Sequence, residues 1–418
     1  MANNFLTAEK IAEKAAFKFA ENLHIINTFK DEYSEAFGPN TGETAKLKRT
    51  MFSSASGVGV DATSTDNSQD QGSIDMIANF DRHQKITVTE KERKYDIDDF
   101  AEKVLNSPMR KLAAESEAFA HKYIAENSIG LIGTPGTPQT NTDIINDIAE
   151  YFDNYHIPYD MRMSCLNPAA KRNMIRDLQS INSQAKYLPP SLAKGALHPV
   201  GGIDLYSHNI YNTHTTGNYG GTPLVNGGTQ SVAWSAVRNS YTQTLVTDGW
   251  SASATLKAGD RFTLAGVNGL HPETKEDIGD LQVFTVVSDA TADGSGNATL
   301  TITPPILLTS GSGTTPNYAT VTAAPADNAA ITVLTGTANT AYKQSLFYHP
   351  EAIGFQSIPY STSEVAYADT AVKTLENGSL PVFVEKARSA NVAEDVYLLR
   401  VRFALVIREP RACGVLYA

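Results

Sequence analysis

The side chains that could carry out chemistry are few and widely spaced in this sequence. Nine histidines are spread along the chain, and the closest two are His208 and His214, within SHNIYNTHTTG. Their spacing matches no common zinc arrangement. We therefore expect both to be surface or turn residues, and we expect no metal site.

Two other groups invite a catalytic interpretation. Asp98 and Asp99 form a carboxylate pair, but they stand where a helix is predicted to begin, and acidic residues there complement the helix dipole. Cys165 lies in the apolar stretch MRMSCL with no histidine partner evident in the sequence. Cys165 and Cys413 are the only cysteines, which excludes a disulfide framework and predicts two buried thiols.

Sequence motifs for nucleotide binding or hydrolysis are absent as well. The chain contains no GxxxxGK[ST], GxSxG or HExxH pattern. The glycines of SASGVGVD do not lie between a buried strand and a helix, so they do not indicate a dinucleotide site. We therefore expect neither a catalytic centre nor a cofactor.

Composition narrows the class of protein further. The chain has 418 residues, 41% apolar and 19% charged, which is ordinary for a globular protein of roughly two to three domains. The net charge of −11 argues against a general affinity for phosphate backbones. No apolar run approaches the roughly 20 residues that span a bilayer, and the N-terminus lacks a signal pattern. We expect no membrane partner and folding in a cytoplasm.

The N-terminal segment is predicted to be an amphipathic helix that ends near residue 37, before Gly38-Pro39. Apolar residues recur at helical spacing at Ile11, Ala15, Phe19, Leu23 and Ile26. No helix adjacent in sequence could cover this stripe. We therefore expect it to dock on a neighbouring subunit or on a later helix, with Phe19 and Leu23 as contact residues.

Residues 41–95 are predicted to form an extended hairpin, whose returning strand is KITVTEKERKYDI. The tip, residues 51–81, has no lysine or arginine, and it carries Asp61, Asp66, Asp70, Asp75 and Asp81. Loops of this length are uncommon unless they are functional or disordered. Two interpretations stay open, an arm that reaches a neighbouring subunit and the lid of an enzyme.

A long helix is predicted to follow the hairpin. Ser107-Pro108 is a helix start, and the apolar stripe continues to about Asn127, which gives a rod of roughly 30 Å. Arg110 and Lys111 lie near its start and are candidate partners for the acidic tip. Next we expect a helix over 143–152, a buried strand over 161–166, and a helix capped by Asn167 that reaches residue 182.

The composition changes at about residue 222. Residues 222–340 are rich in Thr, Ala, Gly, Ser and Val, with short strands between turns, which predicts a β-sandwich or barrel. Both flanks mix helix and strand, so the module is predicted to be an insertion in a discontinuous host domain. Arg238 and Asp248, expected on a loop before SASATL, are candidates for ion pairs with a neighbouring subunit.

The order of these elements, together with four short stretches, carries a resemblance to a known family. The stretches are AGDRFTLAGVNGLHPETK, LQVFTVV, SVAW (Ser231–Trp234) and HPEAIGF (His349–Phe355). The chain resembles the major capsid proteins of tailed double-stranded-DNA bacteriophages, whose fold is shared with the herpesvirus capsid floor. Within that family it is similar to the branch that carries an inserted β-barrel.

The resemblance implies an α+β fold with an N-terminal arm, an extended loop, a peripheral domain with a spine helix, an axial domain and an inserted all-β barrel. The expected parts are the arm at 1–40, the extended loop at 41–95, the peripheral domain at 96–135 and the first part of the axial domain at 136–222. The barrel is expected at 223–340, and return strands at 341–418 complete the axial and peripheral domains.

The implied function is structural, without catalytic activity. Copies of the chain would self-assemble, as pentamers and hexamers, into an icosahedral head around double-stranded DNA that the subunits contact only weakly. A scaffolding protein and a portal protein are implied partners. The implied location is the virion capsid, assembled in the cytoplasm of a bacterial host.

Some members of the family join neighbouring subunits covalently, from a lysine on the extended loop to an asparagine of another subunit. The tip of this chain has no lysine, so we expect it to dock non-covalently, with Arg110 and Lys111 as partners. Two alternatives remain: a carbohydrate- or surface-binding virion or tail component that uses the β module, and an enzyme with a lid. The first would favour exposed aromatic clusters, yet the only tryptophans are Trp234 and Trp250.

Overall fold

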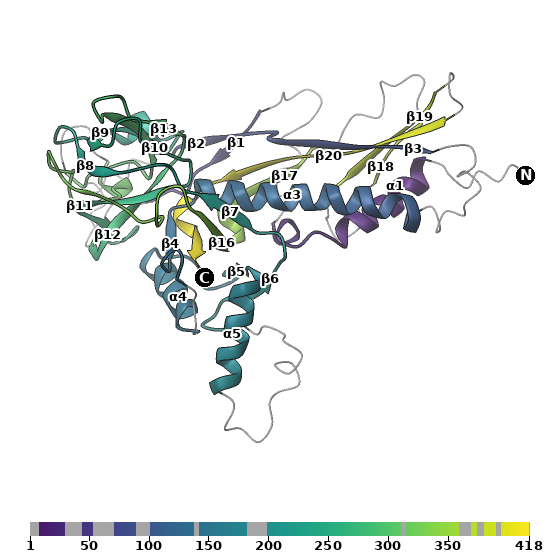
Figure 1. The fold of residues 1–418 in the computed structure, drawn as a ribbon, viewed down its shortest axis with the longest axis horizontal. Coiled ribbons are helices and arrows are strands. Elements are labelled where there is room, and N and C mark those ends of the chain that lie inside the picture. Colours follow the sequence, from purple (N-terminus) through teal and green to yellow (C-terminus); the bar gives the residue numbers. More distant parts are fainter. Residues whose placement is uncertain are drawn as a thin grey trace, which may run out of the picture. The chain divides into compact units, whose positions relative to one another are not determined.

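The computed structural model describes residues 8–29, 44–52, 71–88, 101–137, 142–181, 199–310, 315–358, 369–373, 380–389 and 394–417. The chain divides into two compact units, each built from separate segments. Unit 1 comprises Met1–Lys46, Asp75–Ala120 and Ile353–Val406, and unit 2 comprises Leu47–Ile74, His121–Ala352 and Ile407–Ala418. The predicted α+β class is confirmed (Figure 1).

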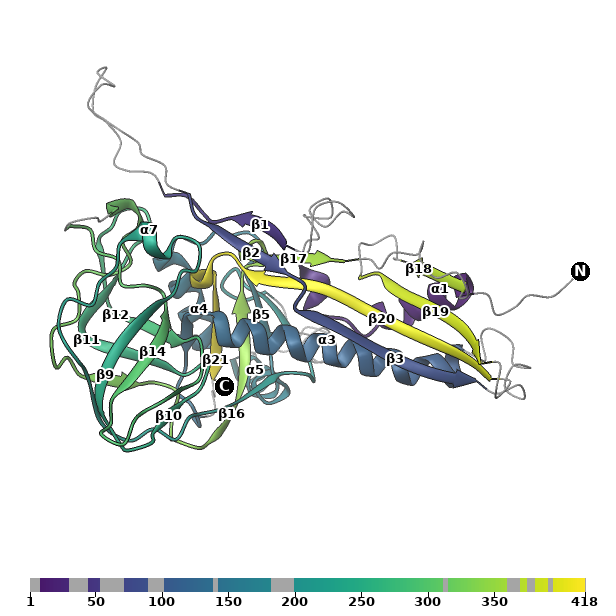
Figure 2. The same cartoon turned by 90° about the horizontal axis from the view of Figure 1, so that it is seen from above.

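Unit 1 is built on an antiparallel sheet around one long strand. Its strands are β17 (Ile353–Ser357), β20 (Glu394–Ile407), β19 (Val382–Ser389) and β18 (Asp369–Lys373), in that order, and β3 (Phe80–Val88) also pairs with β20. Figure 2 shows β3, β20 and β19 running side by side. Alternate residues of β20 are buried from Asp395 to Phe403, which is the two-residue period of a strand with one covered face.

The helices of unit 1 begin with α1 (Ala8–Ala20) and a 3-10 turn, η1 (Ile26–Thr28). A π-helical turn, η5 (Ala101–Leu105), leads without a break into α3 (Asn106–Asn127), whose last turns belong to unit 2. The predicted stripe on α1 is buried, but against β18, β19 and η5 of the same chain. The expected cover by a neighbouring subunit or a later helix is therefore only partly right, because η5 leads into α3 but strands β18 and β19 of the same chain also cover the stripe.

The N-terminal helix ends at Ala20, and not near residue 37 as the sequence predicted. The buried carboxylate of Glu117 on α3 explains why the helix does not continue past Ala20. It accepts hydrogen bonds from the backbone N–H groups of His24, Ile25 and Ile26 at 2.8, 3.2 and 3.3 Å. Ile25 and Ile26 are buried at the start of η1, where backbone N–H groups have no partner within the helix, so the carboxylate satisfies them.

The extended hairpin also differs from the prediction. β1 (Thr44–Lys48) pairs with β2 (Ser73–Ile77), whereas the predicted returning strand overlaps β3, which pairs with β20 instead. Asp75 lies on β2 and Asp81 on β3, both exposed, so they are strand residues rather than parts of the tip. Asp61, Asp66 and Asp70 lie outside the described residues.

Unit 2 contains a mixed sheet flanked by two helices. The sheet order is β4 (Gly130–Ile132), β21 (Cys413–Tyr417), β16 (Ala341–Tyr348), β5 (Met163–Leu166) and β6 (Asp204–Ser207), and β7 (Asn212–Thr215) also pairs with β16. The helices are α4 (Asp143–Asn154) and α5 (Pro168–Ile181). The predicted cap of α5 is confirmed, because Asn167 Oδ1 accepts from the N–H groups of Ala169 and Ala170 at 3.0 and 2.8 Å.

The inserted β module of unit 2 is a nearly closed barrel. Its main sheet has the order β15 (Ile331–Val333), β11 (Arg261–Leu270), β12 (Asp277–Val286), β14 (Ala298–Thr303), β9 (Gln243–Trp250) and β8 (Gly221–Val225). Val225 N–H donates to the carbonyl of Ala329 at 3.0 Å, which brings the end of β8 beside the start of β15. Closure removes most of the exposed sheet edge.

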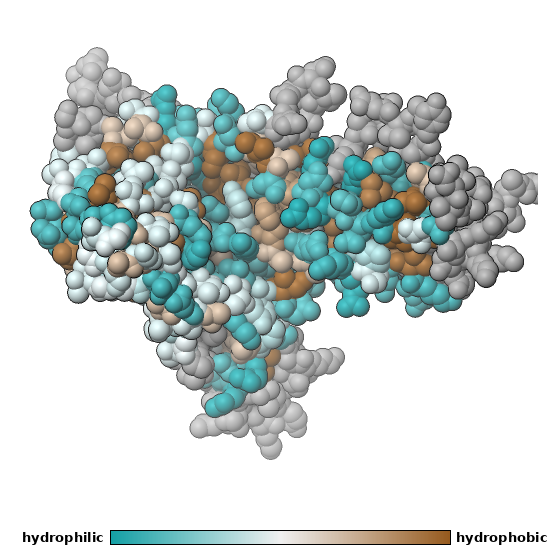
Figure 3. Space-filling model, turned by 45° about the horizontal axis from the view of Figure 1, so that its top comes forward, coloured by the Kyte–Doolittle hydropathy of each residue, from teal (hydrophilic) through white to brown (hydrophobic). Residues whose placement is uncertain are grey.

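Smaller elements complete the barrel and its surroundings. They are α7 (Trp234–Val237), β10 (Thr255–Leu256), β13 (Ala290–Thr291), and the 3-10 turns η7 (Pro316–Tyr318), η8 (Pro350–Ala352) and η9 (Pro410–Ala412). The barrel core is apolar and includes Phe262, Leu264 and Phe284. Its surface in Figure 3 is mostly white to pale teal, as expected from its Thr, Ser and Gly content. Among the described residues, no helix combines the length and hydropathy needed to cross a bilayer.

Candidate structural site at the barrel junction and the loop base

The turn Gly259-Asp260-Arg261 holds the barrel to the rest of unit 2. Gly259 has a φ of +93°, and a Cβ atom there would lie 3.3 Å from the His214 ring, so glycine suits both the conformation and the space. Asp260 is fully buried and accepts from the N–H groups of Lys257 and Gly217, at 2.7 and 3.1 Å.

Two further donors complete the shell of the Asp260 carboxylate. His214 Nε2 lies 2.8 Å from Oδ1, and Thr335 Oγ1 donates to the same oxygen at 3.2 Å. Residues 214–217 lead into the barrel and residue 335 follows its last strand. Asp260 therefore ties together the two segments by which the chain enters and leaves the insertion.

Arg261 forms the second half of this junction, and its side chain is fully buried. Its Nη2 donates to the carbonyl of Ala125 at 2.7 Å, and to the carbonyl and hydroxyl oxygens of Ser128 at 3.1 and 3.0 Å. Thr285 Oγ1 also donates to the Ser128 carbonyl, at 2.8 Å. The last carbonyls of a helix lack partners within the helix and carry partial negative charge, so a cation from the barrel satisfies the C-terminal end of α3.

A second cluster fixes the base of the long loop, where residues 49–52 lead into the segment 53–70. Arg49 is buried, and it donates to the carbonyls of Arg408 and Ser240 at 3.2 and 3.4 Å. Its guanidinium also lies 5.1 Å from the centre of the Tyr241 ring. The base of the loop is thus bonded both to the C-terminal segment and to the chain between α7 and β9.

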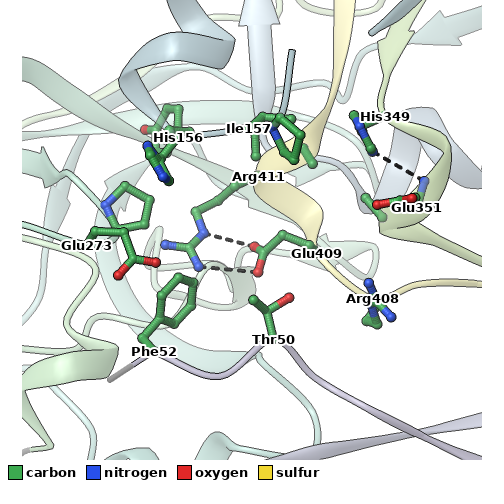
Figure 4. A pocket seen from close by; sticks show the side chains of 15 residues that line it. Thr50, Phe52, His156, Ile157, Glu273, His349, Glu351, Arg408, Glu409 and Arg411 are labelled. Atoms are coloured by element: carbon green, nitrogen blue, oxygen red, sulfur yellow. Dashed lines mark hydrogen bonds and ion pairs between the residues drawn. The ribbon is translucent and has the colours of Figure 1, made fainter. Parts of the chain in front are cut away.

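Phe52 is held by the barrel and by two cations. Asn317 Nδ2 donates to its carbonyl at 2.7 Å, and its ring meets the Tyr318 ring edge-on at 6.1 Å. Arg411 Cζ and Lys275 Nζ lie 5.0 and 5.1 Å from the ring centre, both within the range of cation–π contacts. Figure 4 shows Phe52 beside Arg411.

Arg411, which is buried, and Glu409, which is partly buried, form an ion pair on the wall of a cavity of about 240 Å³. Arg411 Nε and Nη2 donate to the two carboxylate oxygens of Glu409 at 2.9 and 3.3 Å, as Figure 4 shows. Burial alone would raise the pKa of Glu409, but the charge and hydrogen bonds of Arg411 together with the charge of Arg49 outweigh it and lower that pKa. Burial, assisted by the Arg411 charge, lowers the pKa of Lys275 to about 7.

The residues that the sequence proposed as subunit contacts lie at several places. Phe19 and Leu23 are 0% and 3% exposed, so they are core residues of unit 1. Arg110 and Lys111 are exposed at the start of α3, and Lys111 Nζ lies 3.2 Å from Glu115.

The predicted loop position is wrong for Asp248, whereas Arg238 lies in the turn that follows α7. Asp248 lies on β9 opposite Leu224 of β8, because the strand continues to Trp250. Arg238 is the C-cap residue of α7. Both side chains are half-buried within unit 2, and their role in subunit contacts stays a prediction.

Sequence reasoning missed the buried histidines. His208 and His214 are 9% and 6% exposed, and not surface residues as predicted. The alternation of NTHT, in which only His214 among the four is buried, was the available signal. The His121 ring stacks near His208 with centres 6.4 Å apart, and burial lowers the pKa of His121 to about 3.

The two cysteines are buried and form no disulfide, as predicted. The sequence showed no histidine partner for Cys165, but the structure places His121 Nε2 at 3.9 Å from its sulfur. Burial keeps this imidazole neutral, so it supplies no positive charge to stabilise a thiolate. Burial likewise raises the pKa of the Cys413 thiol. The arrangement is that of two structural thiols.

Comparison with known proteins identifies the family. The chain matches the family described as "P22 coat protein - gene protein 5" over residues 1–417. No curated protein matches it. A solved structure titled "CUS-3 coat protein I-domain" is 35% identical, covering 28% of this chain and 97% of that one, with a TM-score of 0.21.

Other solved structures cover most of the chain at low identity. One from "Mycobacterium phage Che8" is 9% identical, covering 95% of this chain and 90% of that one, with a TM-score of 0.44. The "Capsid structure of the Cyanophage P-SCSP1u" is 11% identical, covering 90% and 84%, with a TM-score of 0.43. On the family match over nearly its whole length, the chain belongs to the P22 coat protein family and is a structural major capsid protein of a phage head.

Proposed function

We propose that copies of this chain assemble, as pentamers and hexamers, into the closed icosahedral shell that surrounds packaged double-stranded DNA. Membership of the coat protein family over residues 1–417 supports this role. The net charge of −11 also supports it, because each neutralised phosphate would hold the DNA to the wall. The proposed role is structural, and no reaction is assigned to the chain.

The observation that carries the proposal is the anchoring of the loop base. Arg49 and Phe52 contact the C-terminal segment, the α7–β9 connection and the barrel through directional bonds. A loop that reaches a neighbouring subunit is useful in a shell only if its base is rigidly attached to its own subunit. The anchor supplies that attachment, and it connects the loop base to the inserted barrel.

Several finer parts of the proposal concern contacts and partners. The acidic loop tip is proposed to dock on Arg110 and Lys111 of the next subunit, and Arg238 and Asp248 are proposed barrel contacts. Phe19 and Leu23 are proposed to act indirectly, by fixing α1 within unit 1. A scaffolding protein and a portal protein are proposed partners, with assembly in the bacterial cytoplasm. The six-part division of the chain at residues 40, 95, 135, 222 and 340 also remains a proposal.

The test removes the side chains of the anchor in the double variant Arg49→Met with Phe52→Ala. This variant loses the Arg49 hydrogen bonds to the carbonyls of Arg408 and Ser240 and the contacts of the Phe52 ring with Arg411 and Lys275. We therefore expect folded subunits that form fewer fast-sedimenting shells than the wild type. The matched control is Phe17→Ala, because Phe17 is 49% exposed on α1. Circular dichroism checks folding, and sucrose-gradient sedimentation measures shells. Wild-type shell yield from the folded double variant would show that the anchor does not support assembly.

A further inference from the structure

A groove of about 310 Å³ lies in unit 2 between α4, β4 and β12. Its floor is apolar and includes Ile132, Ile278 and Leu281, and Leu281 is 41% exposed. Its rim is acidic, since Asp147 and Glu150 of α4 and Asp280 of β12 line it and all three are exposed. An exposed leucine within a polar rim is the anatomy of a small docking surface.

The sequence of α4 explains the acidic rim. Its apolar residues Ile144, Ile145, Ile148 and Phe152 are buried on one face, which leaves Asp147 and Glu150 on the other. Neither α4 (DIINDIAEYFDN) nor β12 (DIGDLQVFTV) contains a lysine or an arginine. The groove therefore presents negative charge around an apolar centre. A binding partner needs an apolar side chain flanked by positive charges.

An apolar side chain flanked by positive charges occurs on α5 of the same chain. This helix (PAAKRNMIRDLQSI) presents Arg172 and Arg176, both exposed and one turn apart, with the half-buried Ile175 on the same face. Its single acid, Asp177, is occupied, because Oδ2 accepts from the N–H of Thr142 at 2.7 Å. That bond joins α5 to the N-cap of α4, so α5 is fixed beside α4 within unit 2.

We propose that the groove receives the Arg172–Ile175–Arg176 face of α5 from a second copy of the chain. Ile175 would meet Leu281, and the two arginines would meet Asp147 and Glu150. The two surfaces are different, so the contact is head-to-tail and closes into a ring when the rotation between copies closes. The inference rests on the proposed assembly of copies into a shell, and it names a surface by which neighbours recognise each other.

The physical roles of the two kinds of contact differ. Exposed ion pairs contribute little to affinity, so the arginines mainly set orientation and exclude wrong partners. The apolar centre is desolvated on contact and supplies most of the affinity. Because the surface is small, each contact is weak, and the ring holds through repetition around its axis.

Site-directed cross-linking tests the contact. Leu281→Cys and Ile175→Cys are made separately in the full chain, one with a short affinity tag, and the native Cys165 and Cys413 are buried and do not compete. Shells assembled from an equal mixture are treated with a short bismaleimide. We expect tagged–untagged dimers in the mixture at about ten times the level found with either variant alone, because docking raises the effective concentration of the two thiols.

The other outcomes contradict the inference in distinguishable ways. Shells without the mixed cross-link overturn this contact and leave the proposed function standing. Dimers of Leu281→Cys alone would indicate a two-fold contact and would overturn the head-to-tail arrangement. If the wild-type chain forms no shells, the proposed function fails, and the inference fails with it because copies never meet.

Charge reversal gives a second readout. Arg172→Glu with Arg176→Glu should leave folded subunits with several-fold lower shell yield, and the further changes Asp147→Lys and Glu150→Lys should restore assembly. The control adds Asp204→Lys and Glu276→Lys instead, which change the net charge equally on exposed residues outside the groove. Equal rescue by both pairs would mean that only net charge matters. If the arginine changes lower the shell yield and the lysine changes do not restore it, and if a lysine-rich peptide binds the wild-type groove, the groove would be assigned to another protein.

Discussion

Arg261 on β11 donates a hydrogen bond from Nη2 to the carbonyl oxygen of Ala125 in the last turn of α3, at 2.7 Å. The guanidinium is fully buried. The first residue of β11 therefore caps the C-terminal end of α3. The barrel thereby takes part in holding the C-terminal end of this helix, in addition to packing its own core.

Loss of the Arg261 side chain should destabilise the subunit strongly. Arg261→Met leaves the carbonyls of Ala125 and Ser128 with fewer partners, and we expect a loss of about 2–4 kcal/mol in the free energy of unfolding. Urea denaturation measures it, with Arg172→Met as the control because Arg172 is exposed on α5. A loss no larger than that of the control would contradict the capping role.

Lys275 should give the stability of the subunit a dependence on pH in the alkaline range. Its folded-state pKa is about 7, below the unfolded value near 10.4, mainly because of burial. Between these values the unfolded chain binds more protons than the folded one, so stability rises as the pH rises from 7 to 10. We expect Lys275→Met to be more stable than the wild type at pH 7, with a difference that shrinks toward pH 10. Parallel curves for the two proteins would rule out a buried, titrating Lys275, and Lys122→Met on the exposed part of α3 is the control.

Glu117 should have the opposite effect between pH 4.5 and 7. Burial raises its pKa to about 7, although the N–H groups of His24, Ile26 and Ile25 act to lower it. The folded chain then holds a proton that the unfolded chain has lost, so this group's contribution to stability is complete below about pH 4.5 and declines as the pH rises toward 7. Glu117→Gln removes this slope. Denaturation of both proteins at pH 5, 6 and 7 measures the difference, and an unchanged slope in the variant would show that Glu117 does not titrate there.

The contacts of the extended loop should be non-covalent and sensitive to salt. Residues 51–81 contain no lysine, so the amine for a lysine–asparagine bond is missing at the tip. Boiling particles in detergent should give one band at the monomer mass of 45.1 kDa. Exposed charges are screened over about 8 Å at physiological ionic strength, so particle stability should fall as salt is added. A ladder of covalent oligomers would refute the first expectation, and stability independent of salt would refute the second.

Periodicity and turn chemistry predicted the barrel, α4, α5 with its Asn167 cap, and the burial of the α1 stripe. These features depend on local sequence, where apolar spacing and capping residues act over a few positions. One of the four stretches that carry the family resemblance contains Gly259-Asp260-Arg261, and the structure gives these residues a physical role in joining the barrel to α3.

The features that the sequence did not predict correctly depend on contacts between distant segments. The end of α1 at Ala20 is set by Glu117, some ninety residues later in the chain. The pairing of β3 with β20 joins Phe80 to Phe403, and the burial of His214 depends on Asp260. The loop base likewise relies on Arg49 reaching the carbonyl of Arg408. Single-sequence patterns carry no record of which distant partner a strand or a charged side chain will meet.

The most direct test of the central claim is a negative-stain electron micrograph of the purified full-length chain under assembly conditions. The proposed function predicts closed shells, or at least tubes and capsomer rings, built from this one chain. A homogeneous field of monomers of 45.1 kDa, at concentrations and with crowding agents that promote assembly, would contradict it.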